Sequence, residues 1–263
     1  LAIMAVLALA VPVVPSGSAG ALDPRPAETQ PAGSDSGPVE PTPLDEQLLS
    51  GDDVTAGGPI DLSPEVRFVI RSPSRQLWRV GALDTYTGDG WTRTGISGPY
   101  LGDLDEPPGS ARTVVQQYRL RTEATDLPAA AYPVDVRNLS SDAIEVTSTE
   151  TLTVDGRLPG GTNYTIESRV PTPNASDLRA AGTNYPSSIE RRYTTLPEDT
   201  VPERVRDLTD QVTSQSSNPF DAASAVESYL EGEKEYSQNV SSPSSSMADG
   251  FLFEMEAGYC TYY

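Results

Sequence analysis

The sequence contains no histidine and only one cysteine, Cys260. A single cysteine cannot form an internal disulfide, so packing must stabilise the fold. The absence of histidine excludes an imidazole base anywhere in these 263 residues. The sequence also lacks a glycine-rich phosphate loop, zinc-ligand spacing and a dinucleotide-binding fingerprint, so we expect no metal and no cofactor.

Lysine is nearly absent as well, since Lys234 is the only lysine among 18 basic residues. The 38 acidic residues give a net charge of -20, which argues against nucleic acid and anionic membrane surfaces as partners. Abundant Asp and Glu with little lysine and few aromatics indicates a halophilic protein, because charge repulsion is screened over about 3 Å at 1 M salt. An ordinary acidic surface is the alternative. The clusters Asp52-Asp53 and 103–106 lack the oxygen spacing of a calcium loop.

Long hydrophobic runs are scarce, and the longest, residues 1–14, is too short to span a bilayer alone because about 20 residues are needed. It is typical either of the apolar part of a signal peptide or of the outer end of a membrane helix. Both readings predict a protein at the cell membrane, with the residues after about 15 extracytoplasmic. Four sequons favour an exported, N-glycosylated surface: Asn138, Asn163, Asn174 and Asn239.

The pattern along the chain predicts an α+β fold. Residues 15–60 are rich in Pro, Gly, Ser and acidic residues and predict a disordered stalk. Residues 61–170 hold short runs of period two, which predict an antiparallel β-rich domain with a tight turn at Asp155-Gly156. Residues 171–199 resemble a second connector. Helical signals begin only after it, in residues 200–263.

Two helices are expected in this last region. Residues 200–203, Thr-Val-Pro-Glu, have the spacing of a capping box, with Val201, Val205, Leu208 and Val212 following on one face. Asn218 and Pro219 supply an N-cap and a first-turn proline for the second helix, which Gly232 is expected to end.

The most informative segment is residues 250–263, Gly-Phe-Leu-Phe-Glu-Met-Glu-Ala-Gly-Tyr-Cys-Thr-Tyr-Tyr. Gly258 permits a tight turn before Cys260. A helix beginning at Cys260 would direct free amide donors at the sulfur and at a developing oxyanion. A thiol attacks as thiolate, so its pKa must be lowered by such a helix terminus or by an imidazolium. The alternative is a small buried hydrophobic residue.

This segment, with residues 221–230 ahead of it, resembles the nucleophile region of the transglutaminase-like branch of the papain-type cysteine enzymes. The resemblance covers roughly residues 205–263 and implies the helical first half of that core, truncated just after the nucleophile. It implies that Cys260 attacks a protein or peptide carbonyl to give a thioester, leading to cross-linking, deamidation or hydrolysis. The His and Asp partners would then lie beyond residue 263. Tyr236 and Tyr259 are the candidates for an oxyanion or pocket position.

Residues 77–91, Leu-Trp-Arg-Val-Gly-Ala-Leu-Asp-Thr-Tyr-Thr-Gly-Asp-Gly-Trp, resemble the extracellular part of membrane-anchored prokaryotic, haloarchaeal transglutaminase-like proteins. This resemblance implies anchoring through the N-terminal segment and a missing C-terminal helix. Trp78, Tyr86 and Trp91 are interpreted as packing residues of the sheet rather than site residues. The competing hypothesis is a non-catalytic cell-surface scaffold or binding module with a degenerate transglutaminase-like fold.

Overall fold

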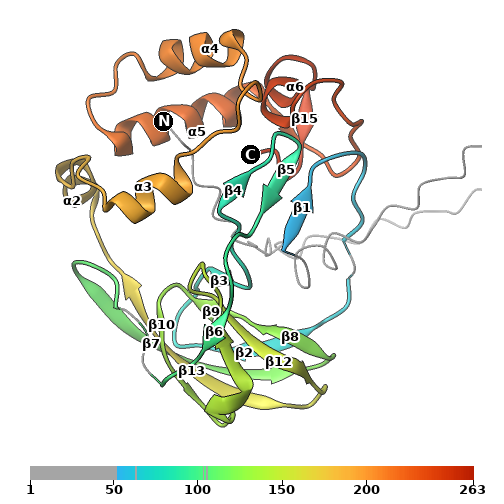
Figure 1. The fold of residues 1–263 in the computed structure, drawn as a ribbon, viewed down its shortest axis with the longest axis vertical. Coiled ribbons are helices and arrows are strands. Elements are labelled where there is room, and N and C mark those ends of the chain that lie inside the picture. The colour runs from blue at the N-terminus through green and yellow to red at the C-terminus, as the bar shows by residue number, and fades with distance from the viewer. Residues whose placement is uncertain (1–51, 63, 103, 105) are drawn as a thin grey trace, which may run out of the picture.

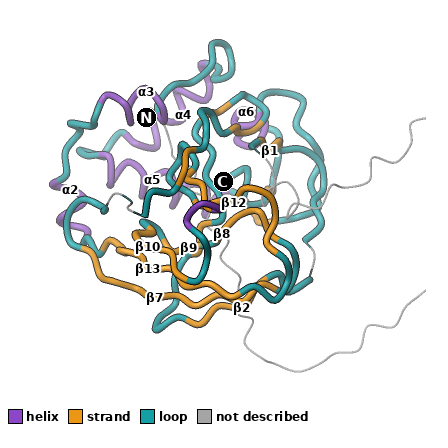
Figure 2. Tube along the Cα trace, turned by 60° about the horizontal axis from the view of Figure 1, so that its bottom comes forward, coloured by secondary structure: helices purple, strands orange, loops and turns teal. Residues whose placement is uncertain are grey.

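The computed structural model describes residues 52–263 except 63, 103 and 105. Its elements form a β sandwich, a small three-stranded sheet and a group of helices on one side (Figures 1 and 2). This is the α+β fold that the sequence predicts, with the antiparallel β-rich part before the helices. The predicted membrane segment at residues 1–14 and most of the predicted stalk lie outside the described residues. Within the described part, none of the helices has the length and apolar character needed to cross a bilayer.

The sandwich consists of two four-stranded antiparallel sheets, in the orders β10-β13-β7-β2 and β6-β11-β12-β8. The strands of the first are β2 (Phe68–Arg71), β7 (Ala111–Leu120), β10 (Pro133–Arg137) and β13 (Asn163–Pro171). Those of the second are β6 (Gly98–Pro99), β8 (Ala124–Leu127), β11 (Ile144–Val146) and β12 (Leu152–Leu158), with a 3-10 turn, η1 (Ser141–Ala143), before β11. A short pair, β3 (Trp78–Arg79) and β9 (Ala129–Ala130), joins them.

The main core lies between these two sheets. Along β7 the residues Val114, Gln116, Tyr118 and Leu120 are buried and their neighbours are exposed, which is the alternation of a strand with one solvated face. Tyr118 and Tyr164 stack with ring centroids 4.7 Å apart. Trp78 packs against this core, as the sequence predicts.

One buried polar network crosses the core. The Gln116 Oε1 atom accepts hydrogen bonds from the Tyr118 hydroxyl and the Ala130 backbone N–H, both at 2.8 Å. Its Nε2 donates to Ser168 Oγ at 2.9 Å, and the Ser168 hydroxyl donates to Ala130 O at 3.0 Å. Because every polar atom of the amide has a partner, a fully buried glutamine is tolerated here.

The predicted tight turn at Asp155-Gly156 is wrong. Both residues lie inside β12, where the register with β8 shifts between Thr153 and Leu158. Gly156 has a φ of 90°, so it provides the left-handed conformation that a bulge requires. The chain reverses later, where the Thr162 N–H donates to Pro159 O at 3.2 Å.

The small sheet has the order β1-β5-β4, from β1 (Asp53–Thr55), β5 (Gly90–Thr92) and β4 (Thr85–Tyr86). β1 lies within residues 15–60, so the disorder predicted there does not hold from residue 52 on. Composition hid this strand because its pairing partner is about 37 residues away, at the register Val54↔Trp91. A Cβ atom on Gly90 would lie 2.0 Å from Val54 O, so only glycine allows β1 to approach.

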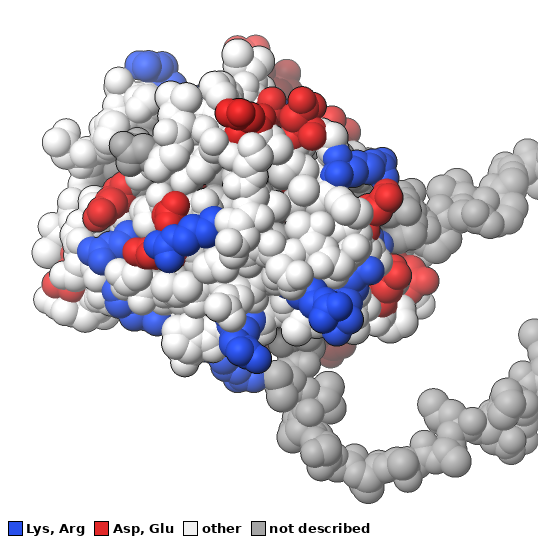
Figure 3. All heavy atoms as spheres, turned by 90° about the horizontal axis from the view of Figure 1, so that it is seen from below, with Lys and Arg blue, Asp and Glu red and all other residues white. Residues whose placement is uncertain are grey.

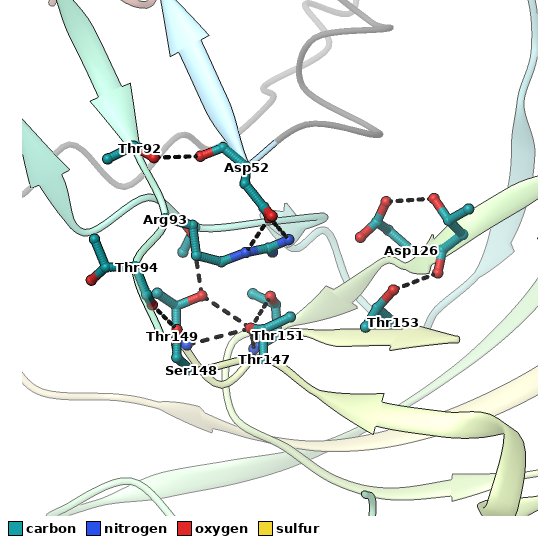
Figure 4. A network of polar contacts seen from close by, with 12 residues as sticks. Asp52, Thr92, Arg93, Thr94, Asp126, Thr147, Ser148, Thr149, Thr151 and Thr153 are labelled. Carbon is teal, nitrogen blue, oxygen red and sulfur yellow. Dashed lines mark hydrogen bonds and ion pairs between the residues drawn. The ribbon is translucent and has the colours of Figure 1, made fainter. Parts of the chain in front are cut away.

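A polar network joins the small sheet to the β11–β12 hairpin (Figure 4). The Arg93 Nε atom donates to Asp52 Oδ1 at 2.9 Å, and the Ser148 hydroxyl donates to Thr94 O. In the hairpin, Thr147 Oγ1 lies 3.1 Å from Thr149 Oγ1 and 2.7 Å from Thr151 Oγ1. These contacts fix the small sheet against the sandwich.

The helices are α2 (Ala175–Ala180), α3 (Ser187–Tyr193), α4 (Glu203–Thr213), α5 (Pro219–Glu233) and α6 (Met247–Phe253). The first two lie in the predicted connector, so the expectation that helices begin only after residue 199 is wrong. Their signal was present, because Asn174 and Asp177 form a capping box at the start of α2. The sequence reading took Asn174 only as a sequon.

The caps of the longer helices are partly as predicted. Asn218 caps α5 by accepting from the Asp221 N–H at 3.0 Å, and Pro219 is its first residue. The capping box at Thr200 is wrong, because the Thr200 hydroxyl donates to Pro197 O and the N-cap of α4 is Pro202. Gly232 lies within α5, which ends one residue later.

Candidate active site

The Cys260 segment is positioned by a short parallel strand pair. β14 (Glu235–Tyr236) pairs with β15 (Ala257–Gly258), with Tyr236 opposite Gly258. A Cβ atom on Gly258 would lie 2.6 Å from Phe251 Cε2, so this close packing requires glycine. Cys260 follows in a turn that the Tyr262 N–H closes on Tyr259 O at 2.8 Å. Residues 260–262 are thus a turn, and the helix expected from Cys260 is not formed within the described residues.

The Cys260 thiol is free and half-buried. Burial raises its pKa above the ordinary value, and hydrogen bonds from Thr261 lower it by less. The thiol is therefore protonated at neutral pH, which is the opposite of an activated nucleophile. The sequence contains no imidazole that could change this.

Tyr236 lies next to Cys260. Its side chain is 59% exposed, but burial of the hydroxyl raises its pKa, and the Cys260 thiolate charge raises it further. Hydrogen bonds to the hydroxyl from the Gln238 side chain and the Cys260 backbone act in the opposite direction. The two residues that the sequence singled out on β14 and after β15 are thus neighbours in space.

Tyr259 is placed differently. Its side chain is 1% exposed, its ring centroid lies 4.9 Å from that of Tyr262, and its hydroxyl accepts a hydrogen bond from the Gly57 N–H at 3.1 Å. These contacts fasten the segment after β1 to the Cys260 turn. Tyr259 is not among the residues that line the neighbouring cavity.

That cavity has a volume of about 210 Å³ and begins beside Thr261, the residue after Cys260. Most of its wall is apolar and comes from α4, α5 and α6, including Val205, Leu208, Val226, Leu230 and Phe251. Tyr86 and Trp91 of the small sheet complete it. Their rings lie 5.2 Å apart and pack on the Tyr259 and Tyr262 cluster, as predicted from the sequence.

Three charged contacts hold this region together, and sequence reasoning missed all of them. Arg204 on α4 binds Asp249 on α6 through two bonds, Nε–Oδ1 at 2.5 Å and Nη2–Oδ2 at 2.6 Å. Lys234 Nζ donates to Leu252 O at 2.9 Å and to Met255 O at 2.6 Å, which caps the C-terminus of α6.

The third contact joins the small sheet to α3. Asp84, with a side chain that is fully buried, binds Arg192 Nε at 2.5 Å and accepts from the Thr94 N–H at 2.8 Å. Burial alone would raise the Asp84 pKa, but hydrogen bonds from Thr94 and Arg192 outweigh it and hold the pKa below its ordinary value. No pattern in the sequence links position 84 to position 192.

The remaining candidates are on the surface. The four sequon asparagines are all exposed, on Asn138, Asn163, Asn174 and Asn239. In the part of the chain that the structure covers, no group of three or more acidic or cysteine side chains is placed to hold a metal ion.

Comparison with known families agrees with this architecture. The model described as "Transglutaminase-like superfamily" matches residues 206–263, which hold α5, α6 and Cys260, so the chain is a member of that superfamily. The model described as "TgpA N-terminal domain" matches residues 1–175. The chain therefore belongs to the TgpA N-terminal domain family, with part of a transglutaminase-like core after it.

Individual relatives extend this result. The chain is 30% identical over 236 residues to the uncharacterized protein YebA of Bacillus subtilis, covering 79% of this chain and 31% of YebA. It thus spans about a third of that relative. Its fold is similar to the periplasmic domain of TgpA from Pseudomonas aeruginosa, with a TM-score of 0.56 and 18% identity over 76% of this chain and 68% of that domain. The ethylmercury-bound form of the same domain gives a TM-score of 0.54, with 18% identity over 76% and 69%.

Proposed function

We propose that this chain carries the nucleophile of an extracytoplasmic, transglutaminase-like cysteine acyl-transfer enzyme. The observation that supports this most directly is the placement of Cys260. It stands in a turn fixed by the β14–β15 pair, beside the Tyr236 hydroxyl and next to the apolar cavity. A thiol held in this way can reach a substrate carbonyl from one side while the neighbouring groups contact the other.

The proposed reaction has two stages. The Cys260 sulfur bonds to a glutamine carboxamide or peptide carbonyl carbon, and ammonia or an amine leaves with a proton to give a thioester. An amine or water then attacks the thioester and releases the thiol. Cross-linking, deamidation and hydrolysis differ only in this second attacking group. The Tyr236 hydroxyl and the Cys260 backbone N–H lie where the oxyanion of the first stage would form.

Proton transfer needs a group that this sequence does not contain, because it has no histidine. We propose, as the resemblance implies, that a His and an Asp beyond residue 263 supply the base and its orienting partner. An imidazolium next to Cys260 would lower the thiol pKa that burial now raises.

The substrate and the cellular location follow the same proposal. A protein or peptide substrate suits an open apolar cavity beside the nucleophile. The fold likeness to a periplasmic domain supports an extracytoplasmic position. Anchoring through residues 1–14 and a further C-terminal helix, adaptation to high salt, and glycosylation of the four exposed sequons complete the proposal.

Thiol reactivity tests the proposal. In this chain, iodoacetamide should alkylate Cys260 slowly at pH 7, with a rate midpoint above the ordinary thiol pKa of about 8.5, because burial disfavours the thiolate. A chain extended through the downstream His and Asp should react fast near pH 7 and release ammonia from a glutamine peptide. Cys260→Ala should abolish turnover in that protein. Equal turnover with alanine at 260 would refute the enzyme.

The non-catalytic alternative also has an observation in its favour, namely a thiol held protonated by burial. It predicts that the extended chain keeps a slow thiol with a raised pKa. Tyr236→Phe separates the two further. In the enzyme it should lower kcat and shift the pH profile, whereas in a scaffold it should change neither the thiol pKa nor peptide binding.

A further inference from the structure

The charge of the chain is unevenly distributed. Residues 171–263, which form the helical part, carry 15 acidic and 6 basic side chains. Residues 64–170, which form the sandwich and small sheet, carry 14 acidic and 11 basic side chains. The sandwich end is therefore nearly neutral, and Figure 3, which views the molecule from that end, shows basic side chains gathered across it.

Much of this basic charge lies on the outer face of β2 and β7. Because Val114, Gln116, Tyr118 and Leu120 point into the core, the alternate residues of β7 point outward. The register places Arg119 opposite Val69 and Gln117 opposite Arg71. At the end of the pair the Arg121 N–H donates to Arg67 O at 2.7 Å, so two arginines face each other across the strands.

This arrangement has no internal compensation. Like charges directly opposite each other destabilise a strand pair. The outward positions of β2 and β7 are otherwise Val69, Thr113, Val115 and Gln117, so neither strand supplies a carboxylate there. Among the described residues, Arg71, Arg119 and Arg121 form no ion pair within 4.0 Å. A chain with 38 acidic residues keeps these guanidinium groups unpaired.

We propose that this outer face of β2 and β7, called here the arginine face, docks on the anionic phospholipid headgroups of the membrane. Guanidinium groups bind phosphate oxygens bidentately, and all the basic residues on this face are arginines. Two apolar side chains stand among them, Val69 at 44% and Val115 at 39% exposure. Exposed valines beside arginines suit the boundary between headgroups and acyl chains, whereas a soluble polyanion gains nothing from them.

The net charge of -20 does not prevent this docking. The excess of acidic residues lies in the helical part, on the far side of the small sheet from the sandwich (Figure 1). Screening over about 10 Å at 0.1 M salt, and less at higher salt, hides this distant charge from the bilayer while contacts at the arginine face persist. Docking in this orientation leaves the Cys260 turn uncovered. The inference stands apart from acyl transfer, because it uses no residue near Cys260.

An environment-sensitive fluorophore tests the contact. The full chain with Cys260→Ser is labelled at Val69→Cys and mixed with phosphatidylglycerol or phosphatidylcholine vesicles. We expect a blue-shifted emission with phosphatidylglycerol alone, and no shift when the label is at Glu227→Cys, an exposed position on α5. Residues 1–14 contribute equally to all these proteins, so any binding through them leaves the comparison intact. A Val69 label that stays in a polar environment would overturn the proposal.

Charge variants add a quantitative test. A basic residue near an anionic surface contributes about a fivefold gain in partitioning, so Arg119→Gln with Arg121→Gln should weaken vesicle binding roughly 25-fold. The matched control, Arg191→Gln with Arg206→Gln, changes the net charge equally at exposed helical positions and should change binding less than twofold. Equal losses in both double variants would contradict the docking face. Binding of soluble polyphosphate through Arg119 and Arg121, without vesicle binding, would assign the face to a soluble polymer instead.

Discussion

Replacing Asp84 by asparagine removes the charge from the one fully buried carboxylate that links the small sheet to α3. Asp84 accepts a hydrogen bond from the Thr94 N–H at 2.8 Å and binds Arg192 Nε at 2.5 Å. Hydrogen bonds to a charged group contribute about 1.5–3 kcal/mol each. Arg192 is 29% exposed and recovers some hydration, so we expect Asp84→Asn to cost about 3 kcal/mol at pH 7. For a unit of this size that lowers Tm by about 6–12 °C.

The pH dependence gives the sharper test. The Asp84 pKa is depressed in the folded protein, so its stabilising contribution is complete above the unfolded value of about 3.9 and disappears as the pH falls through the folded value. Urea unfolding of both proteins should therefore show a large difference at pH 7 that shrinks below pH 4. Asp142→Asn, at an exposed position, is the matched control and should change stability by under about 0.5 kcal/mol. A difference between Asp84→Asn and the native chain that persists unchanged at pH 2.5 would refute the reasoning.

Two further outcomes are expected. Gly258→Ala should cost about 1–3 kcal/mol in urea unfolding because its Cβ would lie 2.6 Å from Phe251 Cε2, whereas Gly232→Ala within α5 should gain about 0.5–1 kcal/mol; equal effects would contradict the packing at Gly258. The net charge of -20 should make Tm rise between 0.1 M and 2 M NaCl as repulsion is screened, and a flat Tm in differential scanning calorimetry would show that the acidic surface serves another purpose.

Short-range patterns predicted much of the sandwich. The alternation in residues 114–120 locates β7, and the run at 144–146 matches β11 residue for residue. The signals at Asn218 and Pro219 locate the start of α5, because capping depends only on neighbouring residues. Where the signal was local, the prediction was close.

Elements that depend on distant partners were missed. β1 has the composition of the predicted stalk and becomes a strand only because Gly90 lets it pair with β5. In the site, the motif identified Cys260, and the strand-like residues at 235–237 placed Tyr236 near it. The pairs Asp84–Arg192 and Arg204–Asp249 join residues 108 and 45 positions apart, and no local pattern encodes such contacts.

The two family matches meet at residues 175–206, but the packing does not divide there. Tyr86 and Trp91 come from the TgpA N-terminal part and share one buried cluster with Phe251, Tyr259 and Tyr262 of the transglutaminase-like part. The Gly57 N–H also donates to the Tyr259 hydroxyl. A cluster with members from both parts cannot form when either part is folded alone. The N-terminal domain is therefore a component of the platform that holds the Cys260 turn, rather than a separate module attached to it.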